Sequence, residues 1–339
     1  MGSLALAMLL MIVSILIRLE GRRAILLQVL VVIGSTLKVC WDRIFEYVKQ
    51  ELDAANCPGG DVPFTDWVGV VSRISDCNTE RWLDQPSGQI FLKAYQLVTA
   101  DASGWFWSQV LLTLVTPLFL HLHVNRVALK RWERVAITGV GLLGAICSAF
   151  SAALLLLNIL HSRKTILRSR KDVEDERKGC SEVRVSPLVI ASGFLSLLCV
   201  FFFLPKTVNT DSTAFTFFLL LLHLSLLAPS LDATPWSPLK DSRQFSRRKL
   251  FLAVGICSAF LHLEALLSSL HKSSGPSFFS AALANPCQTS IFADAMLSTG
   301  FVLLYMLSMS GMGAFKYVAL APLLGPGAML SFYLREQKF

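Results

Sequence analysis

Long apolar blocks separated by polar loops dominate this chain. Nine apolar segments can be marked, at 2–17, 24–41, 104–124, 135–158, 187–204, 212–229, 249–270, 288–310 and 316–334. Most approach the length of about 20 residues that an α-helix needs to cross the hydrocarbon core of a bilayer. A helix is favoured there because it satisfies its own backbone hydrogen bonds. The pattern predicts an all-α fold, a polytopic transmembrane helical bundle of about seven to nine spans.

The first two segments predict attachment to the membrane more than spans. Segment 2–17 is short, and three arginines follow it with no small-residue cleavage site before them. It is therefore interpreted as an uncleaved anchor. Segment 24–41 includes the charged Lys38 and is expected to lie at the membrane interface.

The chain divides into three regions: N-terminal membrane anchor segments (1–41), a polar loop region with interfacial helices (42–103) and the transmembrane bundle (104–339). Within the polar region, stretches 42–48 and 64–74 have amphipathic helical spacing, which is typical of helices lying on a membrane surface. Cys57 and Cys77 share this region and would pair if it faces an oxidising lumen.

Composition and charge support a membrane protein and exclude some functions. The chain is 54% hydrophobic and 16% charged, whereas soluble domains carry about 25% charged residues. The net charge of +8 comes from basic loops, which are expected beside anionic lipid headgroups. These loops lack interleaved aromatic residues and lie between apolar spans, so no nucleic-acid partner is expected.

The basic loops give conflicting predictions of membrane orientation. Loops 161–186 and 237–249 are separated by two predicted spans, so both can be cytoplasmic, as the excess of Lys and Arg on that side requires. With segment 135–158 counted as one span, however, the basic loop 125–134 falls on the opposite side.

An internal repeat is also predicted. The run Ile-Cys-Ser-Ala-Phe at 146–150 recurs at 256–260, with matched leucines and a matched histidine at the same offset. We infer two copies, 135–229 and 249–334, each with three spans. An odd number of spans inverts the second copy, as in many transporters.

The candidate catalytic residues are two acids inside predicted spans, Glu264 and Asp294. A charged side chain near the centre of a membrane helix costs roughly 2.5–3.5 kcal/mol on insertion, so its presence there indicates a functional or structural role. Each lies about 9 Å below the same membrane surface if the two spans are straight and antiparallel. Two carboxyls facing one cavity would keep one protonated, ready to act as a general acid or proton carrier. The alternative is that each acid bonds a neighbouring hydroxyl, carbonyl or histidine and fixes packing only.

No cofactor or metal site is expected. His121 and His123 end segment 104–124, on the same side as the acids if every segment crosses the membrane. Residues two apart on a helix point in nearly opposite directions, so both imidazoles do not readily face one ion. Pro117, Pro322 and Pro326 are expected to kink spans, and Gly325 and Gly327 to allow close approach of neighbouring helices.

The last third of the chain resembles a known family. Its motifs are Asn285-Pro286-Cys287 running to Asp294, then Lys316-Tyr317-Val318 running to Gly325-Pro326-Gly327, and Tyr333-Leu334-Arg335-Glu336. With these motifs, its size, its spans and its basic loops, the chain resembles the fungal integral membrane proteins of indole-diterpene biosynthetic clusters, the PaxA/LtmS-type group. Over most of the chain the resemblance is one of architecture. No catalytic motif of the family can be matched to this sequence residue by residue.

The resemblance implies a fungal source, a role in secondary metabolism and a place in the endoplasmic reticulum membrane. Such clusters include membrane-embedded terpene cyclases, which protonate an epoxide or alkene with a buried acid; Glu264 and Asp294 would suit that chemistry. Three hypotheses follow: an acid-initiated, metal-free cyclase acting on a lipophilic prenylated molecule, a membrane carrier or efflux protein, and a non-catalytic scaffold for other enzymes of the pathway.

Overall fold

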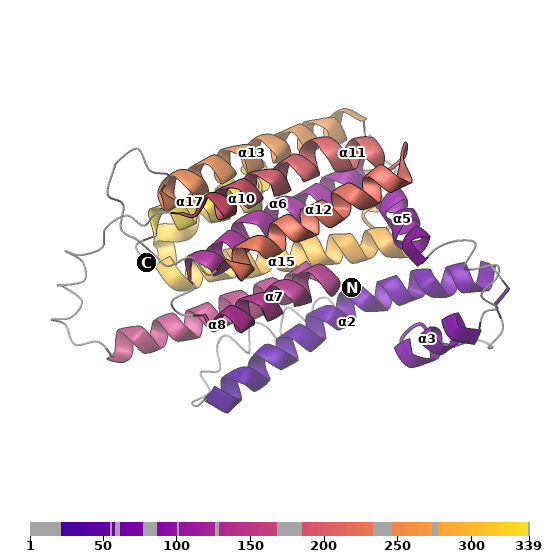
Figure 1. Cartoon of the computed structure of the whole chain (residues 1–339), viewed down its shortest axis with the longest axis horizontal. Coiled ribbons are helices and arrows are strands. Elements are labelled where there is room, and N and C mark those ends of the chain that lie inside the picture. The colour runs from indigo at the N-terminus through magenta and orange to yellow at the C-terminus, as the bar shows by residue number, and fades with distance from the viewer. Residues whose placement is uncertain are drawn as a thin grey trace.

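A computed structural model describes residues 22–54, 56–57, 62–76, 87–99, 102–125, 129–167, 185–232, 246–272 and 277–337. The regular elements among them are helices, which confirms the predicted all-α class (Figure 1). In chain order they are α2 (Arg22–Ala54), α3 (Trp67–Asp76), α5 (Ser87–Val98), α6 (Ala102–Val124), α7 (Arg131–Leu143), α8 (Ile146–Leu167), α10 (Pro187–Leu198), a π-helical turn (Cys199–Phe203), α11 (Leu204–Thr207), α12 (Ser212–Leu231), α13 (Arg247–Lys272), α14 (Ser277–Ala281), α15 (Pro286–Ser310), a 3-10 turn (Gly311–Ala314), α16 (Phe315–Leu324) and α17 (Pro326–Glu336).

Five helical stretches of the described residues are long and apolar enough to cross a membrane: Ala102–Val124, Pro187–Thr207, Ser212–Leu231, Arg247–His271 and Pro286–Leu324. The protein is therefore membrane-embedded, but the larger predicted number of spans is not confirmed. Segment 2–17 lies outside the described residues. Segment 24–41 and the amphipathic stretch 42–48 belong to one continuous helix, α2, of 33 residues.

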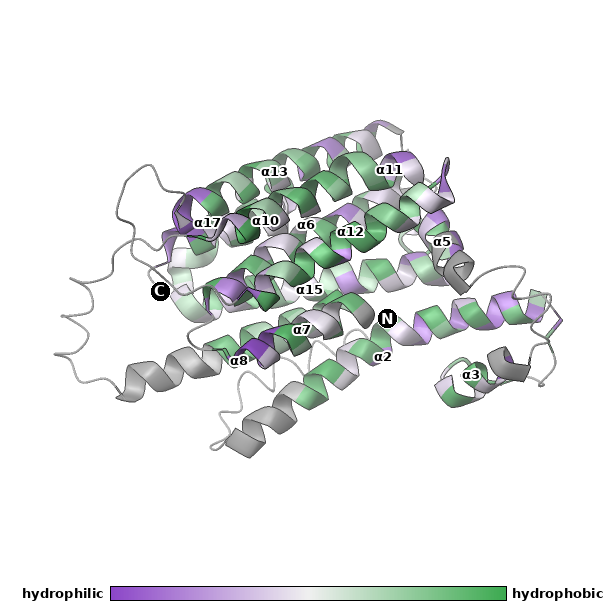
Figure 2. Ribbon diagram, viewed as in Figure 1, coloured by the Kyte–Doolittle hydropathy of each residue, from purple (hydrophilic) through white to green (hydrophobic). Residues whose placement is uncertain are grey.

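Helix α6 forms the centre of the bundle. In its apolar 18-residue stretch, 89% is buried, against 33% for the corresponding stretch of α12. Helix α6 packs against α10, α12, α13, α15 and α17. The outer helices expose large apolar side chains, among them Phe217 and Leu220 on α12 and Phe260 on α13. Figure 2 shows hydrophobic residues along the length of α10, α12 and α13, with hydrophilic residues gathered toward the helix ends. These apolar faces suit contact with lipid.

The predicted span 135–158 is instead part of a hairpin of two helices, α7 of 13 residues and α8 of 22 residues. The chain turns at Gly144, where an added Cβ would lie 2.6 Å from the Val140 carbonyl oxygen and 2.8 Å from Leu37. Helix α8 then runs back beside α7, so that the Cβ of Ala149 would lie 2.8 Å from a Cβ at Gly141. The apolar composition is that of a span, but glycine at the turn lets the chain reverse inside the bundle.

Segment 316–334 is a second hairpin, formed by α16 and α17. Lys316 near its start bonds Glu336 at its end, 3.1 Å away, so both ends of the hairpin lie together. Its turn is at Gly325, with a φ of 89° that favours glycine. Helix α17 has 11 residues, about 16 Å of helix, against about 30 Å of hydrocarbon. The hairpin is therefore too short to cross, and both of its ends lie at the same end of the bundle.

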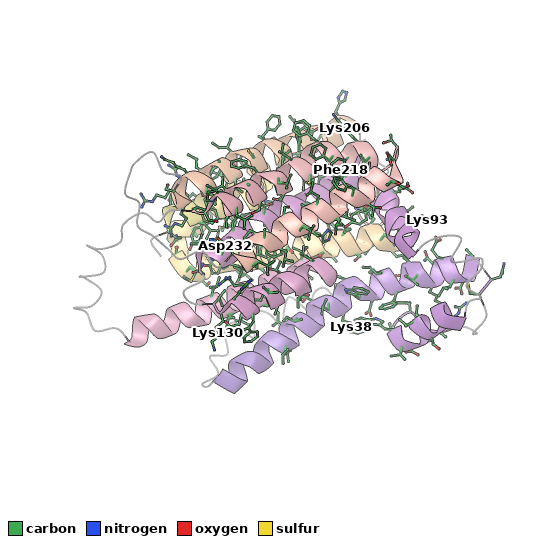
Figure 3. The ribbon with its side chains drawn as sticks, in the orientation of Figure 1. Lys38, Lys93, Lys130, Lys206, Phe218 and Asp232 are labelled. Carbon is green, nitrogen blue, oxygen red and sulfur yellow. The ribbon has the colours of Figure 1, made fainter. Side chains whose placement is uncertain are left out.

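The two hairpins bring the basic segments to one end of the bundle. Arg134, at the start of α7, donates to the carbonyls of Ser230 and Asp232 at the end of α12. Arg247, at the start of α13, donates to the Gln337 carbonyl after α17. We call this the basic end; Figure 3 shows Lys130 and Asp232 there. The predicted placement of 125–134 on the opposite side was wrong, because the α7–α8 hairpin does not cross.

The opposite end of the bundle holds a disulfide-bonded cysteine, Cys57. Cys57 packs with Val98 at the end of α5 and Cys287 at the start of α15. Lys93 and Lys206 lie toward this end in Figure 3, which we call the disulfide end. Cys77, the expected partner of Cys57, lies outside the described residues.

The internal repeat is not confirmed. The first run, 146–150, begins helix α8, whereas the second run, 256–260, lies in the interior of helix α13. The two identical runs therefore occupy different structural settings.

Candidate functional site

The two predicted acids occupy different environments. Asp294 on α15 is 7% exposed and lies inside the bundle, whereas Glu264 on α13 is exposed. Helix α6 packs against both α13 and α15 and lies between them (Figure 1). The structure therefore does not bring these carboxyls into one cavity. Consecutive spans were expected to be neighbours, but the connection through α14 passes α6 before α15 begins.

Asp294 caps the N-terminus of α8. Its Oδ2 accepts the backbone N–H of Ile146 at 2.9 Å and its Oδ1 accepts that of Cys147 at 2.6 Å. The Ser298 hydroxyl donates to Oδ1 at 3.3 Å. The first N–H groups of any helix lack acceptors within the helix. Here a carboxylate from another helix accepts hydrogen bonds from two of them. The partners include two N–H groups of the first turn, so Asp294 caps α8.

The predicted histidines lie at the end of the bundle opposite Glu264. Helices α6 and α13 are antiparallel, because the hydroxyls of Ser103 and Ser269 are 3.1 Å apart and Gln109 donates to the Leu261 carbonyl at 3.0 Å. The C-terminus of α6 thus lies at the start of α13. The expectation that these histidines share a side with Glu264 was wrong, since it assumed that segment 135–158 crosses the membrane.

Each of these histidines has its own partners. The His121 Nε2 lies 3.0 Å from the Tyr305 hydroxyl on α15. The His123 Nδ1 lies 2.9 Å from the Pro229 carbonyl oxygen and its Nε2 lies 3.8 Å from a carboxylate oxygen of the buried Asp232. The two imidazoles therefore bond different helices and hold the basic end of the bundle together.

The turn of the α16–α17 hairpin meets a set of buried polar side chains. The ring of His262 on α13 packs against Gly325: an added Cβ there would lie 2.7 Å from its Cγ and 3.0 Å from its Nδ1. The His262 Nε2 lies 3.2 Å from the Pro322 carbonyl oxygen, to which it donates. That bond leaves Nδ1 as an acceptor in the neutral imidazole. Nδ1 has no hydrogen-bond partner among the described residues.

Two more buried polar atoms near this turn also lack a partner among the described residues. One is the Gln109 Oε1 on α6, whose amide nitrogen is held by the Leu261 carbonyl; the other is the hydroxyl of Ser258, one turn before His262 on α13. Gln109 and Ser258 are each 1% exposed and His262 is 3% exposed. Buried polar atoms nearly always have a partner, so three unpaired atoms around one turn indicate a site for a ligand or water.

Backbone groups at the same place lack their usual partners within the helix. Pro117 has no N–H, so the Thr113 carbonyl four residues earlier in α6 loses its usual partner. Gly327 lies directly against that carbonyl, and an added Cβ would be 2.5 Å from its oxygen. The first turn of α17 offers the N–H groups of Gly327 and Ala328, which have no partner within the helix. The predicted close approach at Gly325 and Gly327 is confirmed.

Aromatic side chains flank this site. The ring of Phe106 lies 5.3 Å from that of His262, centroid to centroid, and 5.0 Å from Trp107. Trp107 in turn contacts Phe292 at 4.7 Å and Phe279 at 6.1 Å. The site therefore has a polar part at the hairpin turn, formed by His262, Gln109 and Ser258, and an apolar part beside it. We call the whole the hairpin-turn site.

Sequence reasoning did not single out His262, Gln109 or Ser258. Each stands in an apolar segment, and the signal that identifies them is a polar side chain on a buried helix face opposite a Gly-Pro-Gly turn. Polar side chain and turn meet only because α16 and α17 form a hairpin, and the hydropathy pattern does not predict that hairpin.

The chain matches no protein-family model, no curated protein and no solved structure.

Proposed function

We propose that this protein is a membrane carrier for a lipophilic molecule that bears a hydroxyl or carboxyl group. The observation that carries the proposal is the hairpin-turn site, where a half-helix ends inside the bundle beside unpaired buried acceptors. Broken helices are tolerated at membrane depth only where they are buried in protein or line a cavity. In carriers such breaks hold the substrate near the middle of the membrane.

The chemistry of the site selects the ligand. The Nδ1 of His262 and the Oε1 of Gln109 accept hydrogen bonds, so they call for a donor on the ligand. The start of α17 supplies N–H donors and a partial positive charge, which favour an oxygen acceptor. A hydroxyl or a carboxylic acid offers both in one group. The neighbouring aromatic rings suit a hydrocarbon chain, in keeping with the prenylated partner expected from the sequence.

Transport would require the α16–α17 hairpin to shift against α13 and α6, on which it packs. A small displacement of this hairpin would open the site toward the basic end. Passage to the other leaflet would then require a second opening on the disulfide side, as alternating access demands.

The test uses the full chain in nanodiscs with farnesol, a prenyl alcohol, as the probe. We expect His262→Ala and Gln109→Ala each to weaken farnesol binding about tenfold, since each removes about one hydrogen bond worth roughly 1.4 kcal/mol. The matched control is His223→Ala, because His223 bonds the carbonyl of Leu219 in its own helix. Equal binding by His262→Ala, Gln109→Ala and the control would refute the site. Transport is then measured as farnesol transfer into sealed proteoliposomes.

A second candidate is the membrane-embedded terpene cyclase. It is favoured by the aromatic group of Phe106, Trp107 and Phe292, since aromatic faces stabilise cationic intermediates. In this case the acid would be Glu264, which is exposed where a lipophilic substrate approaches from the bilayer. Given the resemblance above, the substrate tested would be an epoxidised prenyl-indole.

Microsomes containing the protein would be incubated with that substrate and compared with Glu264→Gln and Asp294→Asn variants. The cyclase proposal expects product from the wild type and at least about a hundredfold less from Glu264→Gln, because general acids contribute that much. If the wild type leaves the substrate unchanged, the cyclase proposal fails and the carrier proposal is unaffected. A scaffold role is left if neither farnesol binding nor conversion occurs.

We also propose that the basic end faces the cytosol and the disulfide end an oxidising lumen. The excess of Lys and Arg at one end follows the positive-inside rule, and a disulfide at Cys57 needs an oxidising compartment. The endoplasmic reticulum, expected from the resemblance, meets both conditions.

A further inference from the structure

Three potential metal ligands meet at the turn of the other hairpin. The Sγ of Cys40 on α2, the Sγ of Cys147 on α8 and a carboxylate oxygen of Asp294 on α15 all lie within 4.8 Å of one another, and all three side chains are buried. The residues come from three helices that are far apart in the sequence. Neither the hairpin-turn site nor any proposed reaction uses them.

The spacing of the two sulfurs fits a shared ion. They are 3.8 Å apart, too far for a disulfide bond of about 2.05 Å. Two thiolates bound at about 2.3 Å to one tetrahedral zinc ion are themselves about 3.8 Å apart. The separation also allows a weak S–H···S hydrogen bond, which is the ordinary explanation for two buried thiols in contact.

The surrounding bonds hold the three ligands in place. The hydroxyls of Thr36 and Ser148 lie 2.8 Å apart and join α2 to α8 one turn from the thiols. Ser290 donates to the Cys40 carbonyl at 3.0 Å and joins α2 to α15. The Trp41 indole donates to the Gly144 carbonyl at 3.0 Å, at the turn of the hairpin. The ligand geometry is thus fixed before any ion binds.

The electrostatics of the site suit a divalent cation. Two thiolates and one carboxylate carry three negative charges, of which Zn²⁺ would cancel two. The remaining charge would face the start of α8, whose N–H groups and dipole favour negative charge. The Asp294 carboxylate accepts hydrogen bonds from two backbone N–H groups, from the Ser298 hydroxyl and from the Cys147 thiol. Loss of the thiol proton would free a lone pair of the carboxylate for a metal.

We propose that Cys40, Cys147 and Asp294 bind one Zn²⁺ ion and that this ion fastens the α7–α8 turn to α2 and α15. Both thiols lose their protons to solvent as the two Zn–S bonds form, and one carboxylate oxygen of Asp294 completes the three protein ligands. Thiolate sulfur with carboxylate oxygen is a ligand set that zinc takes, usually in tetrahedral geometry. The fourth position is left to a water molecule. The site is independent of the carrier and cyclase proposals.

The experiment purifies the full chain under reducing conditions and measures bound metal by mass spectrometry. The wild type is expected to hold about one zinc per chain, and Cys40→Ser and Cys147→Ser at least about tenfold less. Cys199→Ser and Cys257→Ser are the matched controls, since both cysteines are free and neither belongs to the group of three ligands. The controls are expected to keep their zinc.

A spectrum of the wild type keeps the test independent of how the variants fold. Replacement of zinc by Co²⁺ is expected to give a thiolate-to-cobalt charge-transfer band and the visible bands of a tetrahedral ion. Zinc no higher than in the Cys40→Ser, Cys147→Ser double variant, or cobalt without the charge-transfer band, would overturn the proposal. A disulfide between Cys40 and Cys147 in the reduced preparation would overturn it as well.

Discussion

The two hairpins follow similar paths but have opposite polar environments at their turns. Both enter the bundle from the basic end and turn at a glycine, Gly144 with a φ of −111° and Gly325 with a φ of 89°, and the second helix of each begins in the interior. At the α7–α8 turn the start of α8 is closed by the carboxylate of Asp294. At the α16–α17 turn the start of α17 faces His262, whose Nδ1 has no partner among the described residues. The polar groups at the α7–α8 turn therefore hold helices together, whereas those at the α16–α17 turn include an unpaired acceptor that a ligand could use.

The difference shows that a buried acid in a membrane segment need not be catalytic. Asp294 satisfies backbone donors that would otherwise be unpaired in the membrane interior, where each would cost several kcal/mol. The neutral His262 costs less to bury than a charge, so it can be left unpaired and available to a ligand. The predictions below test this contrast in order of expected effect.

Asp294→Ala is expected to have the largest effect, a loss of about 3 kcal/mol or more of stability. It leaves the N–H groups of Ile146 and Cys147 buried without an acceptor. Thermal unfolding in detergent measures the loss, with Glu264→Ala as the control, expected within about 0.5 kcal/mol because its side chain is exposed. Equal effects of the two substitutions would remove the anchor role of Asp294.

Gly325→Ala is expected to destabilise the protein by about 2–4 kcal/mol. Its φ of 89° is unfavourable for alanine, and the added Cβ would lie 2.7 Å from the His262 ring. Gly139→Ala is the control, since a Cβ there meets nothing within 4 Å, and alanine in a helix should stabilise by up to about 1 kcal/mol. A neutral Gly325→Ala would mean that the turn is not built as described.

His262→Phe is expected to change stability by less than about 1 kcal/mol while weakening farnesol binding about tenfold, as His262→Ala does. The substitution removes one unpaired buried nitrogen along with one hydrogen bond, and these effects oppose each other. His121→Phe breaks a paired histidine and is expected to cost about 1–3 kcal/mol. A large loss of stability in His262→Phe would show that His262 is a packing residue.

The smallest expected effect is the pH dependence of the pair that closes the α16–α17 hairpin. The Tyr317 hydroxyl and the Lys316 ammonium beside Glu336 hold the pKa of that carboxyl below its usual range. A lowered pKa stabilises the fold above the unfolded value of about 4.3 and the gain is lost as pH falls through the folded value. Lys316→Ala should therefore lower the unfolding temperature at pH 7, by about 1 °C or less for an exposed pair, and have no effect at pH 3.

Much of the fold follows from the hydropathy pattern, because burial of apolar surface and backbone pairing in lipid dictate helices. The all-helical class, the long apolar helices and the close approach at Gly325 and Gly327 could be predicted. The number of spans could not, since a hairpin with an apolar surface has the composition of a span. One glycine at 144 decides between them, through its contacts with Val140 and Leu37.

The candidate site was harder to predict than the fold. The sequence identified Asp294 as unusual but not its role, because the cap lies about 150 residues away in the chain. The proposed metal ligands Cys40 and Cys147 could not be singled out from the sequence, since no ligand spacing marks them. They meet only because α2, α8 and α15 pack together.

The most direct test of the account is the sidedness of Lys130, which decides whether the α7–α8 segment is a hairpin or a span. Single cysteines at Lys130, Lys249 and Lys206, all exposed, would be labelled in sealed vesicles with a membrane-impermeant maleimide. The hairpin predicts that positions 130 and 249 are labelled from the same side and position 206 from the other. Labelling of position 130 together with position 206 would contradict it.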